Sequence, residues 1–138
     1  MSIAATIYPS LSYDDPLAAI EWLCASFGFR LRLLVRDEED GVRHSELSLG
    51  PGVIMVSSAR PEEGRQSPCH LGGVTQALSL FVEDPDAHFA RAEQEGAEIV
   101  QPLQNEAFGA RGYMAKDPEG HLWCFSDYRP GEYWDQEF

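Results

Sequence analysis

Two stretches of the sequence, DPLAAIEWL at residues 15–23 and DPDAHFARA at residues 84–92, begin in the same way. In each, an aspartate stands at a suitable N-cap position and a proline at the first helical position, where its missing N–H costs no hydrogen bond. Apolar side chains recur at helical spacing, and a glycine, Gly28 or Gly96, follows each stretch. We therefore predict two helices of similar design.

The segments around the two helices repeat as well. A β-prone segment precedes each helix, at 4–11 and 76–82. Three more follow each helix, separated by turn-forming sequences such as Gly50-Pro51-Gly52 and Asp117-Pro118-Glu119-Gly120. The order strand, helix, strand, strand, strand is thus written twice. The two aspartates that open the helices lie 69 residues apart, half of the 138-residue chain, which indicates an internal duplication.

We expect the two repeats to form one domain, because each module alone would bury too little apolar surface for independent stability. The expected boundaries are about 3–58 for module 1, 59–73 for a surface connector, 74–127 for module 2 and 128–138 for a C-terminal tail. Burying an aromatic ring contributes on the order of 1.5 to 3 kcal/mol. The tail's Tyr133, Trp134 and Phe138 are therefore expected to pack over a binding site or on a second subunit.

The composition excludes several classes of partner. Ten basic residues stand against 23 acidic ones, which gives a net charge of −13. Such a field repels nucleic-acid phosphates and anionic lipid surfaces, and no apolar window approaches the roughly 18 residues of a membrane span. The three cysteines have neither disulfide-framework nor C-x-x-C spacing. We expect a cytoplasmic protein that binds neither nucleic acid nor membrane, and a small-molecule ligand.

Three local motifs carry a resemblance to a known family. They are DDP with FGF at 14–16 and 27–29, VED with EGA at 82–84 and 95–97, and DPEGHLW at 117–123, the last being the most specific. With the doubled element order, they are similar to the vicinal oxygen chelate superfamily, which contains glyoxalase I, bleomycin-resistance proteins, extradiol dioxygenases and fosfomycin-resistance enzymes. The resemblance implies an α+β fold in which two βαβββ modules form a curved eight-stranded mixed sheet, a cup with helices on its convex side. It also implies a homodimer with the cup near the subunit interface.

The resemblance further implies a divalent metal in the cup, held by His, Glu or Gln on the first and fourth strands of each module. Counting from the helix-start aspartates and from the DPEG turn puts these four positions at Tyr8, Met55, Ala77 and Cys124. Alanine has no donor atom, methionine offers only a thioether, and tyrosine and cysteine must first lose protons with reference pKa values near about 10 and 8.5. We therefore predict no metal at the family position and no cofactor.

Strand alternation predicts the other side chains that share the inside of the cup. They are small or hydroxyl-bearing apart from one phenylalanine: Ser10, Ser12, Ser57, Ser79, Phe81 and Ser126. Such a lining, with bulk from Tyr8, Met55 and Phe81, suits a neutral or aromatic ligand. The alternative for Met55 and Phe81 is that they fill a packed core.

Polar residues elsewhere leave further alternatives open. His44 and Glu46 lie two apart on a predicted strand, so their side chains leave one face about 7 Å apart and suit an acid–base pair, two metal ligands or a buried polar pair. Arg111 either clamps an anionic ligand group or bridges the 104–110 loop to an acidic neighbour. We expect His88 to be exposed, His121 to brace the DPEG turn, and Cys69-His70 to lack a further zinc ligand spaced nearby.

The first hypothesis is therefore a glyoxalase/bleomycin-resistance-like protein that binds, and acts by sequestering, a neutral or cationic small molecule without the usual metal site. Its predicted ligand-binding residues are Tyr8, Met55, Phe81, Arg111 and Cys124. The alternative is a lyase, isomerase or dioxygenase that uses a relocated metal around His44 and Glu46, or proton transfer without metal. A third possibility is an interaction protein with a fully packed cup.

Overall fold

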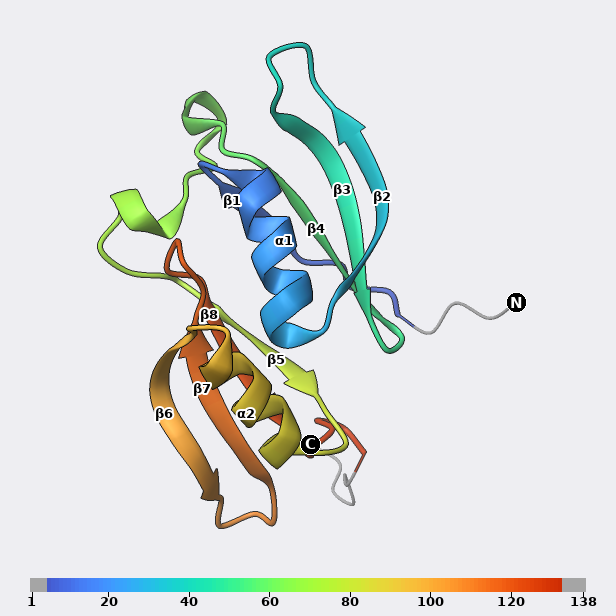
Figure 1. Cartoon of the computed structure of the whole chain (residues 1–138), viewed down its shortest axis with the longest axis vertical. Coiled ribbons are helices and arrows are strands. Elements are labelled where there is room, and N and C mark those ends of the chain that lie inside the picture. The colour runs from blue at the N-terminus through green and yellow to red at the C-terminus, as the bar shows by residue number, and fades with distance from the viewer. Residues whose placement is uncertain (1–4, 133–138) are drawn as a thin grey trace, which may run out of the picture.

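The structure is a computed structural model that describes residues 5–132. Its elements follow the doubled order predicted from the sequence, with two short 3-10 helices in the connector (Figure 1). In chain order they are β1 (Ser10–Tyr13), α1 (Pro16–Phe27), β2 (Arg30–Arg36), β3 (Val42–Leu49), β4 (Gly52–Ser58), η1 (Pro61–Glu63), η2 (Pro68–His70), β5 (Ala77–Phe81), α2 (Pro85–Gln94), β6 (Glu98–Asn105), β7 (Arg111–Lys116) and β8 (Leu122–Ser126).

The eight strands form two hydrogen-bonded sheets with the same internal order. The first sheet runs β1-β4-β3-β2 and the second β5-β8-β7-β6. In each, the first and last strands of the module pair in parallel, and the other neighbours are antiparallel. The predicted α+β architecture of two βαβββ modules is therefore confirmed.

The helix caps explain why both helices begin where the sequence predicts. The Asp15 carboxylate accepts a hydrogen bond from the Ala18 N–H at 3.1 Å, and the Asp84 carboxylate accepts one from the Ala87 N–H at 3.1 Å. These bonds satisfy N–H groups that have no partner inside the helix. Gly28 ends α1 with a φ of 86°, a left-handed conformation that glycine adopts without a side-chain penalty.

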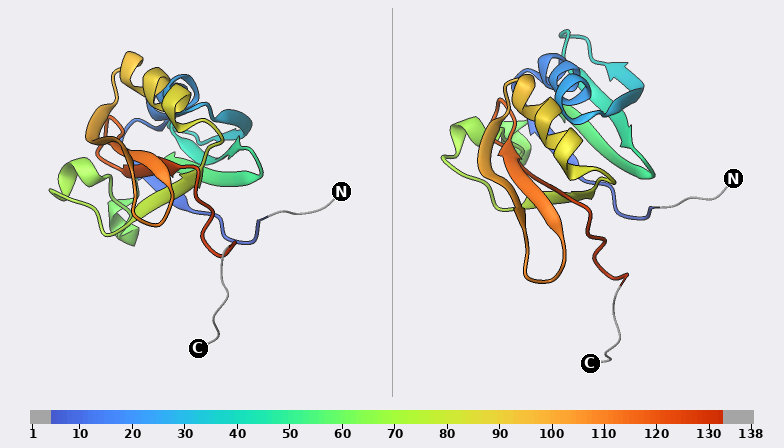
Figure 2. Two further views of the ribbon diagram at one scale, coloured as in Figure 1. Left: turned by 90° about the horizontal axis from the view of Figure 1, so that it is seen from below. Right: turned by 60° about the horizontal axis from the view of Figure 1, so that its bottom comes forward.

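The two helices lie side by side on one side of the molecule, with the sheets beneath them (Figure 2). The core that they cover is shared between the modules, because Phe27 at the end of α1 packs on Trp123 and Phe125 of β8, with ring centroids 5.5 and 4.6 Å apart. We call the sheet faces turned away from this core the inner faces. The helices are on the opposite, convex side, as the resemblance implied.

The DPEG turn between β7 and β8 holds the modules together. Asp117 is 5% exposed, and its carboxylate accepts hydrogen bonds from the Tyr13 hydroxyl at 2.6 Å and from the Trp123 indole N–H at 3.1 Å. His121 contacts the Ser12 carbonyl oxygen at 3.0 Å, which agrees with its predicted bracing role. Burial, together with the nearby Asp117 charge, raises the pKa of Tyr13 well above its usual value. The DPEGHLW motif, the most specific in the sequence, thus connects module 2 to module 1.

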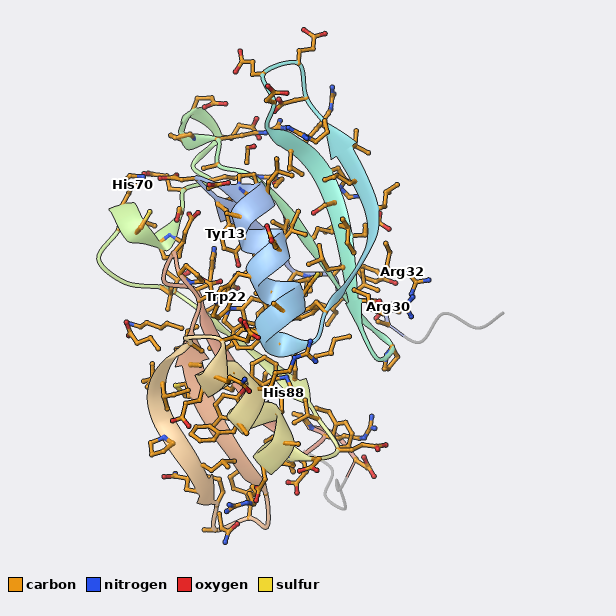
Figure 3. All side chains as sticks on the ribbon, viewed as in Figure 1. Tyr13, Trp22, Arg30, Arg32, His70 and His88 are labelled. Atoms are coloured by element: carbon orange, nitrogen blue, oxygen red, sulfur yellow. The ribbon has the colours of Figure 1, made fainter. Side chains whose placement is uncertain are left out.

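The prediction that His88 is exposed is wrong, because its side chain is half-buried. Its Nε2–H donates to the Phe27 carbonyl oxygen at 2.8 Å, and its Nδ1 accepts from the Tyr113 hydroxyl at 2.6 Å. The ring also packs on Phe125, with centroids 4.2 Å apart. Figure 3 shows His88 where the end of α1 meets α2. The local helical pattern missed this position because its partners come from module 1 and from β7.

Strand β2 lies at an edge of the first sheet and is exposed along its whole length. Its apolar side chains Leu31, Leu33, Leu34 and Val35 are between 37% and 44% exposed. The tail aromatics Tyr133, Trp134 and Phe138 lie outside the described residues. Within residues 5–132, no helix has the length and apolar character needed to cross a bilayer.

Candidate functional site on the inner faces

The strand register shows which residues lie beside two of the four positions that were counted from the sequence. Met55 pairs with Ser10, and Cys124 pairs with Ser79. Tyr8 precedes β1, and Ala77, the first residue of β5, pairs with Leu122. A shift of two keeps a side chain on the same face of a strand. Ala77 and Ser79 therefore share one face of β5, and the four counted positions remain a prediction.

The side chains at the paired positions do not fit the metal that the family implies. Ser10 and Ser79 carry hydroxyls, Met55 a thioether and Cys124 a thiol. Hard and borderline divalent ions take imidazole and carboxylate ligands in such cups, and none of these four residues supplies one. Tyr8 and Ala77, the other two counted positions, carry a phenol and a methyl group and supply neither ligand type.

The inner face of the second sheet carries a cavity of about 380 Å³. Trp123 and Phe125 of β8 and Tyr113 of β7 point into the core, so the alternating residues Cys124 and Met114 point the other way. Cys124 and Met114 are cross-strand partners, and Ser79 lies beside Cys124. All residues that line this cavity fall between Ser79 and Pro130, so module 2 and the start of the C-terminal tail form it.

Aromatic side chains form the rim of this cavity. Phe108, in the β6–β7 turn, is exposed and packs edge-on against Tyr128 with ring centroids 5.0 Å apart. The guanidinium of Arg129 lies 3.6 Å from the ring centre of Phe81, which covers that predicted ligand-binding ring. Glu106, also in the lining, accepts a hydrogen bond from the Gln104 amide at 2.9 Å. The cavity therefore offers ring faces and one carboxylate.

Cys124 is a neutral group in this setting. Burial raises the pKa of the Cys124 thiol, and a hydrogen bond with Ser79 only partly opposes that effect. The thiolate is the nucleophilic form of cysteine, so a raised pKa disfavours covalent chemistry at neutral pH. At this position Cys124 contributes shape and weak polarity.

The inner face of the first sheet carries the ionisable pair instead. His44 Nε2 and Glu46 Oε2 lie 2.7 Å apart, and their side chains are 39% and 41% exposed. Glu46 pairs with Met55 on β4 and with Leu33 on β2. Tyr8 is exposed, and its hydroxyl donates to the Ala5 carbonyl oxygen at 2.5 Å. None of these residues lines the cavity of the second sheet.

Ser10 and Ser12, predicted to share the cup, line a different cavity of about 620 Å³. Its other walls are connector residues such as Gln66 and Leu71, together with His121. The predicted lining is therefore distributed over separate surfaces within one chain.

Arg111 bridges to an acidic neighbour, the second of its two predicted roles. Its guanidinium bonds the Asp86 carboxylate of α2 at 2.6 and 3.4 Å and the Asn105 side chain at 3.2 Å. The hydrogen bond to Asp86 raises the pKa of Arg111. These partners place the guanidinium on the helix side of the second sheet, opposite the inner-face cavity.

The cavity also contains residues that the sequence reasoning missed, chiefly Met114, Phe108 and Tyr128. Met114 was within reach, because pairing the strands that flank the DPEG turn brings it opposite Cys124. No sequence signal indicated Phe108 or Tyr128, which reach the cavity from a turn and from the segment after β8.

Comparisons with known proteins agree with this fold. TioX from Micromonospora sp. ML1 is similar in structure with a TM-score of 0.72 and 38% sequence identity, over 88% of this chain and 94% of that chain. The fosfomycin resistance protein FosX from Listeria monocytogenes has a TM-score of 0.68 at 13% identity, over 94% of this chain and 97% of that chain. That identity shows a shared fold alone.

A curated relative extends the likeness to sequence. The uncharacterised protein Mb0911c of Mycobacterium bovis is 29% identical over 126 residues, which cover 89% of this chain and 83% of the relative. The family model of the Glyoxalase/Bleomycin resistance protein/Dioxygenase superfamily matches residues 6–125. The chain therefore belongs to the glyoxalase/bleomycin resistance protein/dioxygenase superfamily.

Proposed function

We propose that this protein binds a small neutral or cationic organic molecule on the inner face of the second sheet, without a metal at the family position, and that it acts by sequestering this ligand. The observation that carries the proposal is the cavity of about 380 Å³, which lies in the size range of ligand sites. Its lining joins apolar side chains with a few hydroxyls, as in sites that hold ligands by packing and a small number of hydrogen bonds.

The chemistry of the cavity favours an aromatic or cationic ligand. The rings of Phe108 and Tyr128 offer flat faces that attract planar groups and cations. Glu106 adds a carboxylate to the lining, and the net charge of −13 raises the local concentration of cations around the whole protein. An anionic ligand is disfavoured, since Arg111 is already paired with Asp86 on the other side of the sheet.

We further propose that two copies associate through the first sheet, so that its inner face covers the cavity of a partner copy. The exposed apolar side chains of the edge strand β2 support this arrangement, because a row of such side chains on a sheet edge favours association. In such a dimer, Tyr8, Met55 and the pair His44–Glu46 would form the second wall of the ligand site.

The dimer is tested by light scattering after size-exclusion chromatography. Leu33→Asp puts a charge in the middle of β2 and is expected to give a monomer. Leu71→Asp is the matched control, since Leu71 is an exposed leucine in the connector. A monomeric wild type, or a dimer unaffected by Leu33→Asp, contradicts this association.

Ligand binding is tested by a thermal-shift screen of aromatic metabolites, cationic antibiotics, thiols and metal ions, because a ligand that binds the native state raises the unfolding temperature. Hits are then titrated by calorimetry. Cys124→Phe fills the cavity and is expected to lower the affinity of a true ligand at least tenfold, whereas Val100→Phe on the exposed strand β6 leaves it unchanged. Equal affinity of wild type and Cys124→Phe contradicts the site.

A second candidate function, proton transfer on a bound substrate, is favoured by the contact of 2.7 Å between His44 and Glu46. A histidine held by a carboxylate suits general acid–base catalysis near neutral pH. Each hit from the screen is followed by mass spectrometry for chemical change. Conversion that is lost in both His44→Gln and Glu46→Gln supports an enzyme, and a ligand that stays intact supports sequestration.

A further inference from the structure

Three potential metal ligands from two distant segments meet at the connector, away from both inner faces. Asp14 stands in the loop between β1 and α1, and Cys69 and His70 belong to η2. Their ligand atoms all lie within 4.8 Å of one another. His70 Nε2 is 2.5 Å from Asp14 Oδ2, and Cys69 Sγ is 3.6 Å from the same oxygen. Figure 3 shows His70 on the outer side of the connector.

Hydrogen bonds to Glu119 hold both segments in place. The Glu119 carboxylate accepts from the backbone N–H groups of Asp14 and Asp15 at 2.7 and 2.9 Å. It also accepts from the hydroxyl of Ser67, the N-cap of η2, at 2.5 Å. The loop that carries Asp14 and the turn that carries Cys69 and His70 are therefore anchored to the same side chain, so the three ligands are brought together before any ion binds.

We propose that Asp14, Cys69 and His70 form a binding site for a zinc-like divalent transition-metal ion. Thiolate, imidazole and carboxylate are the three side-chain ligands that zinc takes, and hard ions such as Mg²⁺ and Ca²⁺ prefer oxygen alone. Three protein ligands leave a fourth position open for water. The site is separate from the family position, whose residues Met55 and Cys124 lie on the inner faces.

Two of the ligand–ligand distances can be compared with those of a zinc site. Zinc bond lengths and tetrahedral angles separate an oxygen and a sulfur ligand by about 3.6 Å, and an oxygen and a nitrogen ligand by roughly 3.4 Å. The Cys69–Asp14 distance of 3.6 Å already agrees. His70 must move away from Asp14 by less than an ångström, and both side chains are free to do so, being 57% and 46% exposed.

The contacts within this cluster favour a metal-binding site over a catalytic cysteine–histidine pair. The Asp14 carboxylate contacts both the Cys69 thiol and the His70 imidazole through one oxygen, Oδ2. In a cysteine–histidine pair, by contrast, the imidazole itself must take the thiol proton. The thiol and the imidazole both approach the same carboxylate oxygen. An ion bound between the three groups would replace these direct contacts with metal–ligand bonds.

The consequence is a stabilising clamp. An ion at this position ties the connector to module 1, and Glu119, in the DPEG turn, extends the link to module 2. An ion that binds only the folded chain raises its stability by mass action.

The experiment uses the full chain without a histidine tag, stripped with a chelator and titrated with Zn²⁺ by calorimetry and with Co²⁺ by absorption spectroscopy. We expect one ion per chain, a cobalt–thiolate charge-transfer band, and a higher unfolding temperature with Zn²⁺. Cys69→Ser should abolish the band, and Asp14→Asn, Cys69→Ser and His70→Ala should each lower Zn²⁺ affinity by roughly 10-fold or more.

Two control variants locate the ion. Cys24→Ser removes a helix cysteine outside the cluster and should leave binding and the charge-transfer band unchanged. His44→Gln tests the other histidine–carboxylate pair and should also bind as wild type does. Absence of stoichiometric binding, wild-type binding in Cys69→Ser and His70→Ala, or loss of binding in His44→Gln would overturn the proposal.

Discussion

Helix α1 buries Ala19, Ile20, Leu23 and Phe27 to 6% exposure or less, whereas α2 buries only Pro85 and Ala92. Aligned on their capping aspartates, the helices place His88 where α1 has Ala19, and Ala92 where α1 has Leu23. Duplicated sequence units thus give the same strand order but unequal shares of the core. Module 1 supplies most of the buried helix surface: α1 packs on strands β1, β2 and β4 of its own sheet, and Phe27 at its end reaches β8 of module 2.

The inner faces differ in a complementary way. The first sheet presents the ionisable pair His44–Glu46, and the second presents a cavity around Cys124 with an aromatic rim and one carboxylate, that of Glu106. Residues on these faces are not needed to fill the shared core, so they are free to differ between the modules. We infer that the two modules have kept the same strand and helix arrangement while the side chains on their inner faces have diverged.

The unequal burial predicts the largest effect on stability. Phe27→Ala leaves a cavity among Trp22, Trp123 and Phe125 and is expected to lower the free energy of unfolding by about 3–5 kcal/mol. Phe89→Ala in α2, where the ring is only half-buried, should cost on the order of 1 to 2 kcal/mol. Urea denaturation measures both, and equal losses would remove the proposed asymmetry between the helices.

The second prediction concerns the turns that join the last two strands of each module. Module 2 has the buried Asp117 at this place, and module 1 has Gly50-Pro51-Gly52, which carries no carboxylate. Asp117→Ala leaves the buried donors of Tyr13 and Trp123 without their acceptor and should lower the free energy of unfolding by about 2–4 kcal/mol.

Two further variants serve as references in the same denaturation experiment. Asp117→Asn keeps an acceptor oxygen and should lose less stability. Asp127→Ala removes an exposed carboxylate that accepts one backbone N–H, from Arg111, and should cost less than about 1 kcal/mol. If Asp117→Ala costs no more than Asp127→Ala, the DPEG turn is not the link between the modules.

The third prediction compares the inner faces through their two methionines. For a ligand found in the thermal-shift screen, Met114→Ala is expected to weaken binding about tenfold, which corresponds to about 1.4 kcal/mol. Met55→Ala, on the first sheet, should weaken it less, because Met55 does not line the cavity. Calorimetric titration decides the order, and a larger effect at Met55 would move the ligand site to the face that carries His44 and Glu46.

Local signals in the sequence predicted the elements well because helix caps and turns are decided by neighbouring residues. Asp15 and Asp84 cap their helices, and Asp117 closes the DPEG turn, through hydrogen bonds to residues within four positions along the chain. Pairing register depends on where a strand begins, and β1 begins at Ser10, later than its β-prone segment. Tyr8 therefore lies just outside β1.

Contacts between distant segments were the part that the sequence could not supply. Asp14 reaches Cys69 and His70 across more than fifty residues, so no spacing rule indicates the cluster. The environment of His88 has the same origin, since its partners Phe27 and Tyr113 lie 61 and 25 residues away. Helical periodicity describes only one element, and its prediction for His88 was therefore wrong.

His88 also yields the smallest of the expected effects, a loss of stability in acid. Burial lowers the pKa of His88 in the folded protein, so the unfolded chain takes up the proton first as the pH falls. The stability that neutral His88 contributes to the folded protein is fully present above the ordinary histidine pKa of about 6.5 and is lost progressively as the pH falls below it. A protonated ring would also present a second N–H to the Tyr113 hydroxyl, which donates to Nδ1 in the neutral form.

The measurement is the free energy of unfolding between about pH 7.5 and pH 5, the range in which histidine titrates. His88→Gln, whose amide can donate to the Phe27 carbonyl oxygen and accept from Tyr113, should be less stable than wild type at high pH and lose less on acidification. If the free energy of unfolding depends on pH equally in His88→Gln and wild type, His88 does not contribute to the loss of stability in acid. Only packing would then distinguish His88 of α2 from Ala19, its counterpart in α1.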